Sequence, residues 1–528
     1  MAIVLILGIF FGDAVGGRLP LWSGLAVAGV FLAVYLLSRP IKSRFMPLIH
    51  SILLYLACFA VGFYLISVDK RKNSYAFPAE NVAFDAVLVT EPVKKGKIVQ
   101  CEMLVVRQHG KPLRIRASVL RDTIFNRYQH LHVGDGIHAW AAIESTDSIA
   151  PREGSNFDFK RWLEVHDIVG QTFIFHSNWQ KTSVSLQSLS LAERAKLRLM
   201  KLRQKAVETL HVSGLDGAEQ AIVAAMVLGD KSALTTEIRE TYSVSGASHV
   251  LALSGLHLGI IYFLLSFIFV RMRWRIAGQL FSLPLIWLFA LMVGFSSSVV
   301  RAATMLTVYG IVALFGRKSF SLNTLSLAAV IMLVAHPLVL WDVGFQLSFM
   351  AVLGILVFYS PIYEALWRVT DKITMGKARK IRAVEVFLNW TLGLTAVSLA
   401  TQLLTAPLVM HYFGRFPTYF LPTNFVAIPL VTLILYVAAA FFLVVAAEAL
   451  LGVLLLPVKQ FLATALYRLS ALLNSSLETI ASWPGSSIEN IRLSGLQTIL
   501  LYFLIASVAI IVVLLRRNIR NNRLAKMR

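Results

Sequence analysis

Long apolar runs recur along most of the chain and are separated by short polar segments. They lie near residues 2–17, 20–38, 47–68, 250–270, 276–294, 298–315, 322–341, 343–360, 386–411, 420–447, 449–468 and 496–515. A helix of about 20 apolar residues is long enough to cross the hydrocarbon core of a bilayer. The pattern predicts a mostly α-helical polytopic membrane protein with roughly 12 spans.

Residues 69–185 interrupt this pattern and have the composition of a soluble domain. Alternating apolar and polar residues predict half-buried strands at 82–89, 103–106, 113–117 and 137–143. Residues 157–165 have a helical pattern. Several short strands in this length suit a small OB-like β-barrel, a fold that often binds oligonucleotides but is not confined to them.

Residues 186–217 are predicted to form a basic amphipathic connecting helix. One face of the segment 191–211 carries Ala195, Leu199, Leu202, Ala206 and Leu210, and basic side chains surround the rest. Such a helix lies on an anionic membrane surface, or it joins the soluble domain to the membrane with a solvated basic face. The other parts of the chain are a three-helix membrane anchor at 1–68, a membrane domain at 218–515 and a basic tail at 516–528.

Composition excludes an ordinary soluble globular protein. Hydrophobic residues make up 57% of the chain, charged residues make up 15%, and the mean hydropathy is +0.70. The 50 Lys and Arg less the 28 Asp and Glu give a net charge of +22, part of which is the usual basic bias of cytoplasmic loops. The two cysteines, Cys58 and Cys101, exclude a disulfide framework and a four-cysteine zinc site.

The basic loops indicate the orientation in the membrane. They lie at 39–44, 271–275, 317–318 and 368–382 and in the tail. Counting predicted spans places all of them on one side, which the positive-inside rule makes cytoplasmic. Both termini are then inside, and residues 69–249 and 474–492 are outside.

Polar groups within the apolar runs are the main functional candidates, because hydrocarbon penalises them. The strongest cluster lies at 243–259 and contains Ser254, Gly255 and His257. Its glycines permit a broken helix that lines protein or water, and the alternative is a tightly packed small-residue helix. We favour function, since His257 beside Ser254 is costly to bury.

Further polar residues suggest a hydrated interior when they are taken together. An interfacial position is expected for three of them, His336, Asp342 and His411. Prolines at 407, 422 and 429 point to discontinuous helices of the kind that surround permeation sites. The other candidates within the membrane domain are Arg301, Gln346, Gln402 and Asn424.

Motifs for ATP and metal binding are incomplete. The segment 91–98 contains Gly96 and Lys97 but lacks the first glycine and the hydroxyl residue of a P-loop. His130, His132 and Asp135 imitate a metallo-hydrolase motif, but the acid is one place late and the next histidine is missing. No ATP site, metal or cofactor is therefore expected, and the histidine segment is interpreted as a surface strand.

Several segments resemble the ComEC family of bacterial competence membrane channels. The sequence Leu-Ala-Leu-Ser-Gly-Leu-His-Leu-Gly at 251–259 is similar to the family signature. Segments in family order also occur at 224–234, 301–305, 336–337, 344–349, 404–416 and 424–429. The end of the barrel domain at 154–168 is similar as well, although Ser155 and Asn156 depart from the usual lead-in.

The resemblance implies a channel in the bacterial inner membrane that imports single-stranded DNA in natural competence. It implies a DNA-delivery protein outside and an ATP-driven or DNA-binding partner inside. Many members continue into a metallo-β-lactamase-like domain, whereas this sequence ends 13 residues after Leu515, so any nuclease is expected to be a separate protein and this chain is expected not to be an enzyme.

Cations and an aromatic ring on the outer domain are candidate contacts for the strand, because phosphates attract cations and bases stack on rings. These candidates are Arg114, Arg116, Arg121, Arg127 and Tyr128. Two other functions stay open. One is an intramembrane serine hydrolase with Ser248 or Ser254 as nucleophile and His257 or His411 as base. The other is a transporter of a small anion or lipid, which would have a narrow site at the bilayer midplane.

Overall fold

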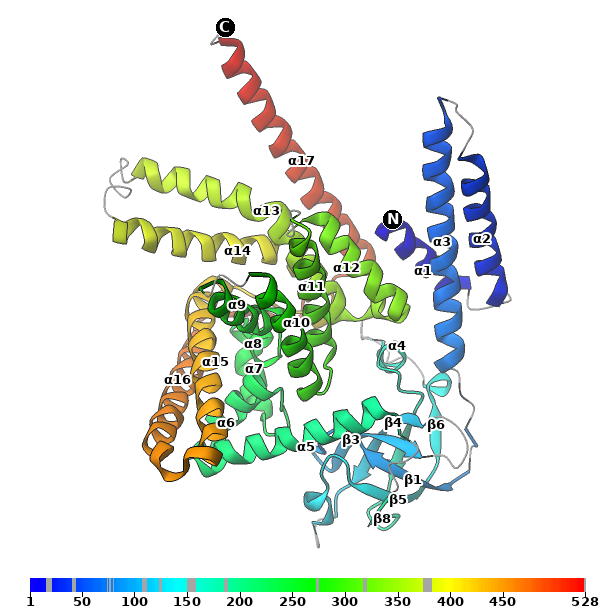
Figure 1. Ribbon diagram of the computed structural model, residues 1–528, viewed down its shortest axis with the longest axis vertical. Helices are drawn as coiled ribbons and strands as arrows, with labels where there is room; N and C mark the ends of the chain where they lie inside the picture. Colours follow the sequence, from blue (N-terminus) through cyan, green and yellow to red (C-terminus); the bar gives the residue numbers. More distant parts are fainter. Residues whose placement is uncertain are drawn as a thin grey trace. The chain divides into compact units, whose positions relative to one another are not determined.

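A helix occupies the place of each predicted apolar run. The computed structural model describes residues 1–526 apart from 16–20, 40–43, 74, 76, 79, 107–111, 123–125, 150–157, 185–188, 272–274, 317–320 and 374–381. Basic loops at 272–274, 317–318 and 374–381 and the segment 154–157 thus lie outside the described residues. The helices are α1 (Ala2–Val15), α2 (Leu21–Ser38), α3 (Met46–Asn73), α9 (Gly255–Arg271), α10 (Arg275–Met292), α11 (Ser297–Leu314), α12 (Leu322–Ala335), α13 (Val343–Ile373), α14 (Arg382–Phe413), α15 (Phe420–Leu451), α16 (Leu456–Ser482) and α17 (Gly495–Lys526) (Figure 1).

Six helices in the described part of the chain are long and apolar enough to cross a membrane. They are α3, α11, α13, α14, α15 and α17. The protein is accordingly a mostly helical membrane protein, as its sequence predicts. The total of roughly 12 spans stays a prediction.

Eight strands between Val82 and Thr182 form one curled sheet, a half-barrel that we call the sheet domain. The order is β6-β7-β4-β3-β1-β5-β8, with β2 beside β3. Only β4 and β7 pair in parallel among the described ladders. The strands are β1 (Val82–Leu88), β2 (Val93–Lys95), β3 (Ile98–Val106), β4 (Leu113–Leu120), β5 (Gly136–Ala141), β6 (Ile143–Ser145), β7 (Gly170–Ile174) and β8 (Trp179–Thr182).

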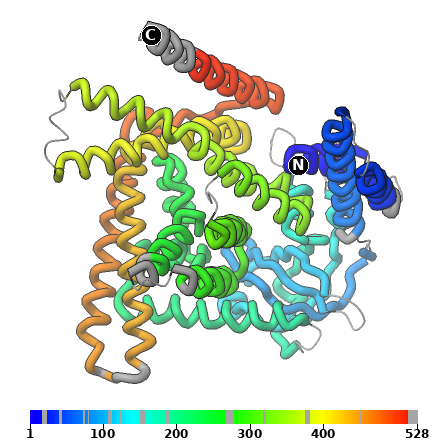
Figure 2. Tube along the Cα trace, turned by 45° about the horizontal axis from the view of Figure 1, so that its top comes forward, coloured from blue at the N-terminus to red at the C-terminus, as the bar shows by residue number. Residues whose placement is uncertain are grey.

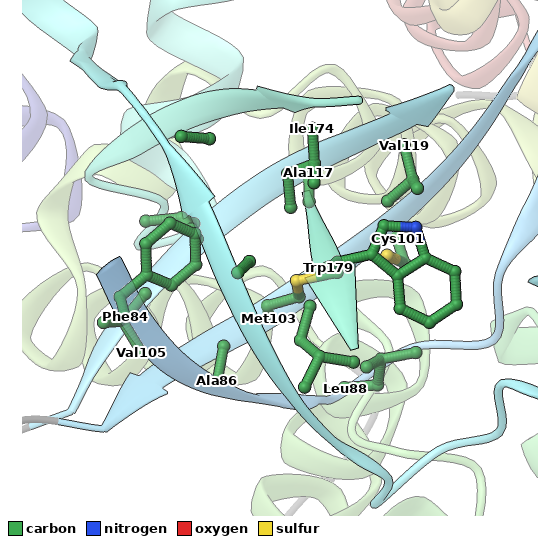
Figure 3. Close-up of a cluster of buried hydrophobic side chains, with 14 of the residues drawn as sticks. Phe84, Ala86, Leu88, Cys101, Met103, Val105, Ala117, Val119, Ile174 and Trp179 are labelled. Atoms are coloured by element: carbon green, nitrogen blue, oxygen red, sulfur yellow. The ribbon is translucent and has the colours of Figure 1, made fainter. Parts of the chain in front are cut away.

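Alternate residues of these strands point into a buried apolar core, which is why the alternation predicted half-buried strands. Met103, Ala86 and Trp179 meet there from three strands (Figure 3). The strand predicted at 137–143 is wrong as a single element, because the chain is divided at Ala142 into β5 and β6. The predicted helix near 157–165 is confirmed as α4 (Phe159–Val165).

Helix α5 (Leu191–Val212) lies along the sheet domain (Figure 2). A capping box between Ser190 and Glu193 starts it. Leu197 and Met200 are buried against apolar side chains of β1 and β3. The predicted apolar face is wrong in part, because Leu202 is 54% exposed and the sheet covers the Leu197 side instead.

The chain forms two compact units. The first contains Met1–Leu234, Ala252–Gln346 and Leu435–Tyr467. Helices α1 and α2 pack on α3 in this unit, and α9, α10 and α11 pack on one another. The short helix α6 (Gly217–Val223) continues into a π-helical turn at Ala224–Leu228.

The second unit contains Thr235–Leu251, Leu347–Ile434 and Arg468–Arg528. It includes most of α13, and α14 packs against α17 within it. Two short helices, α7 (Thr236–Val244) and α8 (Ser248–Leu251), and two paired strands, β9 (Phe416–Pro417) and β10 (Ser487–Ile488), complete this unit.

Ionic contacts tie the sheet domain to helices of the first unit. Arg161 on α4 donates to both carboxylate oxygens of Asp13 on α1, at 2.9 and 2.8 Å. His336, which follows α12, contacts Asp69 of α3 through Nδ1 at 2.8 Å and the carbonyl of Val165 through Nε2 at 3.0 Å. We call these contacts the polar junction. A bidentate arginine–carboxylate pair gives such a junction a defined geometry.

Candidate functional site

The start of α9 brings Ser254 and His257 together. The carbonyl of Ser254 accepts from the backbone N–H of Leu258 at 3.3 Å, so Ser254 stands at the helix start. Nδ1 of His257 turns back to within 2.9 Å of the Ser254 hydroxyl and accepts the Ser254 N–H at 3.3 Å. His257 is fully buried. It therefore caps the start of α9 from within the protein and shapes this segment rather than lining an open surface.

Gly255 and Gly259 present an open face one turn apart on the same helix. A Cβ atom added at Gly255 would meet only the Cβ of Ala302, at 3.7 Å, among the described residues. At Gly259 it would meet no described atom within 4 Å. Gly255 is also exposed. This face of α9 therefore accepts a larger side chain without a clash in the protein itself.

Arg301 forms a buried ion pair, although Asp342 was expected at the interface. Its Nη1 lies 2.7 Å from Oδ2 of Asp342, and the two side chains are only 5% and 12% exposed. Oδ1 of Asp342 accepts the backbone N–H of Gly344 at 3.0 Å. A Cβ at Gly344 would lie 2.7 Å from Nη2 of Arg301, so this position needs glycine for space. The pair satisfies a charge that apolar surroundings would otherwise penalise.

Gln346 lies one turn beyond Asp342 at the start of α13. Its backbone N–H donates to the carbonyl of Asp342 at 3.0 Å, and its side-chain Nε2 donates to the carbonyl of Leu340 at 3.0 Å. Gln346 and Arg301 therefore belong to one polar segment of the first unit, centred on Asp342.

Gln402 and Asn424 belong to the second unit. Asn424 on α15 donates to the hydroxyl of Ser398 on α14 at 3.0 Å. Gln402 lies on the wall of an apolar groove of about 370 Å³ that α14, β9, α15 and α17 form. No described hydrogen bond joins Gln402 to Asn424. Asn424 connects α14 and α15, and Gln402 is a polar residue in the lining of the groove.

Most of the predicted outer cations are engaged within the sheet domain. Arg114 pairs with Glu102. The guanidinium of Arg116 lies over the rings of Phe159 and Trp162, at 5.2 and 4.9 Å from the ring centroids. Arg116 is therefore stacked and partly buried. Burial lowers its pKa, and the charge of Glu102 opposes that shift.

Tyr128 does not offer an open ring to a ligand. It is 4% exposed, and the hydroxyl accepts a hydrogen bond from Arg121 at 3.1 Å. Arg127 donates through Nε to Asp122 at 3.1 Å and keeps 44% of its side chain exposed. Of these residues, Arg127 is the one that the described surface presents to solvent, whereas the buried Tyr128 ring leaves no face for a base.

Two ionisable groups, Glu91 of the sheet domain and Lys196 of α5, have shifted pKa values. Burial, together with the charge of Asp230, raises the pKa of Glu91 to about 7. The same carboxylate accepts a hydrogen bond from Gln204 of α5. Burial, together with the charge of Arg114, lowers the pKa of Lys196 to about 8. The seam between α5 and the sheet domain is therefore sensitive to pH near neutrality.

The interpretation of residues 130–135 as a surface strand is wrong, because His130 ends a 3-10 helix and a turn leads from there to β5. Oδ2 of Asp135 accepts the backbone N–H of His132 at 2.8 Å and pairs with Lys181 at 2.7 Å. Lys181 also donates to the carbonyl of His130 at 2.9 Å. Among the described residues, no three His, Cys, Asp or Glu side chains are grouped in a way that could hold a metal ion.

Two further groups escaped the sequence analysis. Arg415 in the second unit pairs with Glu240 at 2.9 Å and with Glu489 at 3.1 Å, and it donates to Ser243 at 2.9 Å. Its partners lie far apart in sequence, so only the fold reveals them. The second group consists of aromatic residues exposed on the sheet domain, at Trp140, Phe173 and Phe175. Phe173 lies on β7, Phe175 directly follows that strand, and Trp140 lies on β5. The alternation rule missed β7 because the exposed Phe173 is next to the buried and equally apolar Ile174.

Comparison with known proteins identifies relatives that cover more than half of this chain. The chain is 26% identical to ComE operon protein 3 of Bacillus subtilis over 431 residues, which cover 78% of this chain and 50% of that protein. It is 24% identical to Recombination protein 2 of Haemophilus influenzae over 326 residues, covering 59% of this chain and 37% of that protein. The chain thus spans half or less of the length of these curated relatives. No solved structure matches.

A family profile described as Competence protein matches residues 226–517. This range contains all seven polar and glycine candidates of the membrane domain, from Ser254 to Asn424. Since the match covers more than half of the sequence, the chain belongs to the Competence protein family.

Proposed function

We propose that this chain forms a channel in the bacterial inner membrane through which single-stranded DNA enters the cytoplasm during natural competence. The observation that carries the proposal is the family match over 226–517, which encloses every candidate path residue. The open glycine face of α9 supports it, because a passing polymer needs a surface without large side chains.

The proposed path uses Ser254, Gly255, His257 and Arg301 together with Gln346, Gln402 and Asn424. A hydrated passage removes the penalty that hydrocarbon imposes on such groups. His257 and Arg301 act by shaping the segment, since both are buried, whereas Gly255 contributes the open surface. The driving force is supplied by an ATP-driven or DNA-binding partner inside.

Orientation and partners complete the proposal. With roughly 12 spans, the sheet domain lies outside as an OB-like receiver, and both termini lie inside. A delivery protein brings DNA to the outer face, and membrane lipids surround the helices. A cysteine placed at Asn126 should then react with an impermeant reagent in intact spheroplasts, and its protection would reverse this orientation.

The decisive experiment compares two glycines that both have open space. Gly255→Leu adds a side chain on the proposed path, where a Cβ meets only the Cβ of Ala302, at 3.7 Å, among the described residues. Gly29→Leu adds the same side chain on α2, where a Cβ meets no described atom within 4 Å. We expect Gly255→Leu to block import of labelled DNA into the cytoplasm at normal membrane abundance, and Gly29→Leu to import normally. Normal import through Gly255→Leu would remove this segment from the path.

A serine hydrolase is the second candidate, because the Ser254 hydroxyl lies 2.9 Å from a histidine nitrogen. That nitrogen already accepts the Ser254 N–H, which weakens it as a general base. His411, the other proposed base, has Nδ1 2.8 Å from the carbonyl of Leu493. Labelling of the purified protein by a serine-directed covalent probe, lost in Ser254→Ala, would favour the hydrolase over the channel.

A further inference from the structure

Three large aromatic residues stand exposed on the outside of the sheet domain. Trp140, Phe173 and Phe175 are 51%, 46% and 54% exposed, and they are the exposed large apolar residues among the described part of this domain. The intervening Ile174 is buried in the core. Strand β7 therefore carries apolar side chains on both faces, and a group of exposed apolar residues marks a binding surface.

The three side chains belong to one local surface. The rings of Phe173 and Phe175 lie 5.2 Å apart in an edge-to-face arrangement. Trp140 is linked to them through Asn178, whose carbonyl accepts the Trp140 N–H at 3.0 Å and whose N–H donates to the carbonyl of Phe175 at 3.0 Å. We call this group the aromatic strip.

An exposed guanidinium flanks the aromatic strip at one end. Arg127 donates to the carbonyl of His176, directly after Phe175, at 2.7 Å and keeps 44% of its side chain exposed. Exposed rings beside a cation are the arrangement that proteins use to bind single strands, with bases on the rings and phosphates on the cation.

The position of the aromatic strip favours a nucleic acid over a lipid surface. Val165, five residues before β7, contacts His336 in the polar junction with the helices. At about 3.3 Å per residue, Phe175, the first residue after β7, lies roughly 17 Å from Gly170 along the strand direction, at the end that leads away from that junction. Residues 69–214 contain 22 Lys and Arg and 15 Asp and Glu, a net charge of +7 that suits a polyanion.

We infer that the aromatic strip binds the bases of single-stranded DNA and orders the strand before it enters the membrane. This inference rests on the proposed function and names the surface that first holds its substrate. Stacking depends on bases, whereas attraction to cations depends on phosphates. The two contributions can therefore be separated with a strand that lacks bases.

The test uses the full chain in lipid nanodiscs and fluorescent single-stranded oligonucleotides, one of mixed sequence and one abasic with the same number of phosphates. The combined variant Trp140→Ser, Phe173→Ser and Phe175→Ser should bind the mixed strand at least about 10- to 100-fold more weakly, since even one stacked base contributes about that order. Its affinity for the abasic strand should stay as in the wild type. Gln180→Ala, at an exposed position on β8, is the matched control and should bind both strands normally.

Three results would overturn the inference. They are unchanged affinity of the triple variant for the mixed strand, equal losses on both strands, and equal wild-type affinity for both strands. In these cases wild-type binding and import of DNA are unaffected, so the proposed function is not contradicted.

Failure of the wild-type protein to bind either strand, with normal uptake after gene deletion, would instead contradict the proposed function. An unchanged melting temperature of the triple variant confirms that its sheet domain is folded, because the substituted side chains are outside the core.

Discussion

Arginine side chains differ in exposure between the sheet domain and the helical core of the first unit. Arg127 keeps 44% of its side chain exposed beside Asp122, whereas Arg301 is 5% exposed beside Asp342. Solvent screens the half-exposed guanidinium of Arg127, so its attraction to Asp122 is weaker than that of a fully buried pair. A buried pair cannot lose a partner without leaving a charge in apolar surroundings. The comparison teaches that a cation in an apolar segment is first a structural element, and that ligand-binding cations are better sought on the sheet domain.

The largest effect should follow from removing one side of the buried pair. Asp342→Ala leaves the Arg301 guanidinium unpaired, at a cost of about 3–5 kcal/mol, so the protein should fall in membrane abundance and in melting temperature. Replacing both residues with apolar ones should recover much of the loss. Losses in the double variant that equal the sum of the single losses would show that the two charges are independent and would break the comparison.

A smaller but still large effect is expected where α5 covers the sheet domain. Leu197→Ala opens a cavity against β1 and β3 and should cost about 2–5 kcal/mol. Leu202→Ala removes the same atoms from a residue that is 54% exposed and should cost far less. Thermal unfolding of the two variants checks this, and equal losses would place the apolar face where the sequence pattern alone had put it.

Gly344 and Gly259 in the helical core differ in the space that an added methyl group would find. Gly344→Ala pushes the Arg301 guanidinium from its place beside Asp342 and should cost about 1–3 kcal/mol. Gly259→Ala adds the same methyl group into open space and should be neutral or slightly stabilising. The measurement is the membrane abundance of the two variants. A stable Gly344→Ala protein would show that the ion pair of Arg301 and Asp342 has room to shift.

A modest effect of pH is expected at the seam under α5. Folding raises the pKa of Glu91 from 4.5 to about 7, so the folded state holds the proton more tightly than the unfolded state. The stability from this proton is present below pH 4.5 and is lost as pH rises to about 7. Glu91→Gln should therefore make the melting temperature less dependent on pH in this window and raise it above pH 7. Identical pH profiles of the variant and the wild type would contradict this assignment.

The smallest expected effect is at the histidine segment. Replacing His130 and His132 with alanine should leave DNA cleavage by the purified protein at background with and without magnesium or manganese, because Lys181 occupies the nearby carboxylate. Metal-stimulated cleavage that the double variant abolishes would show the sheet domain to be a nuclease.

The apolar runs and the alternating strands were predictable because they depend on local periodicity. Each predicted run contains a helix, and β1, β3 and β4 lie where alternation indicated them. Strand β7 was missed because the exposed Phe173 and the buried Ile174 are both apolar, which interrupts the alternation of apolar and polar residues. For the same reason the aromatic strip could not be found before the sheet was known.

The sequence by itself determined that this is a helical membrane protein with one inserted sheet domain and which polar residues interrupt its apolar runs. Those properties follow from hydropathy and short-range spacing, which need no partner. Only the tertiary structure decided that Arg301 pairs with Asp342, that His257 is buried at the start of α9, and that Tyr128 is covered while Trp140 is exposed. Pairing and burial depend on residues distant in sequence, and so the same polar residue becomes a structural contact or a binding group according to what the fold places beside it.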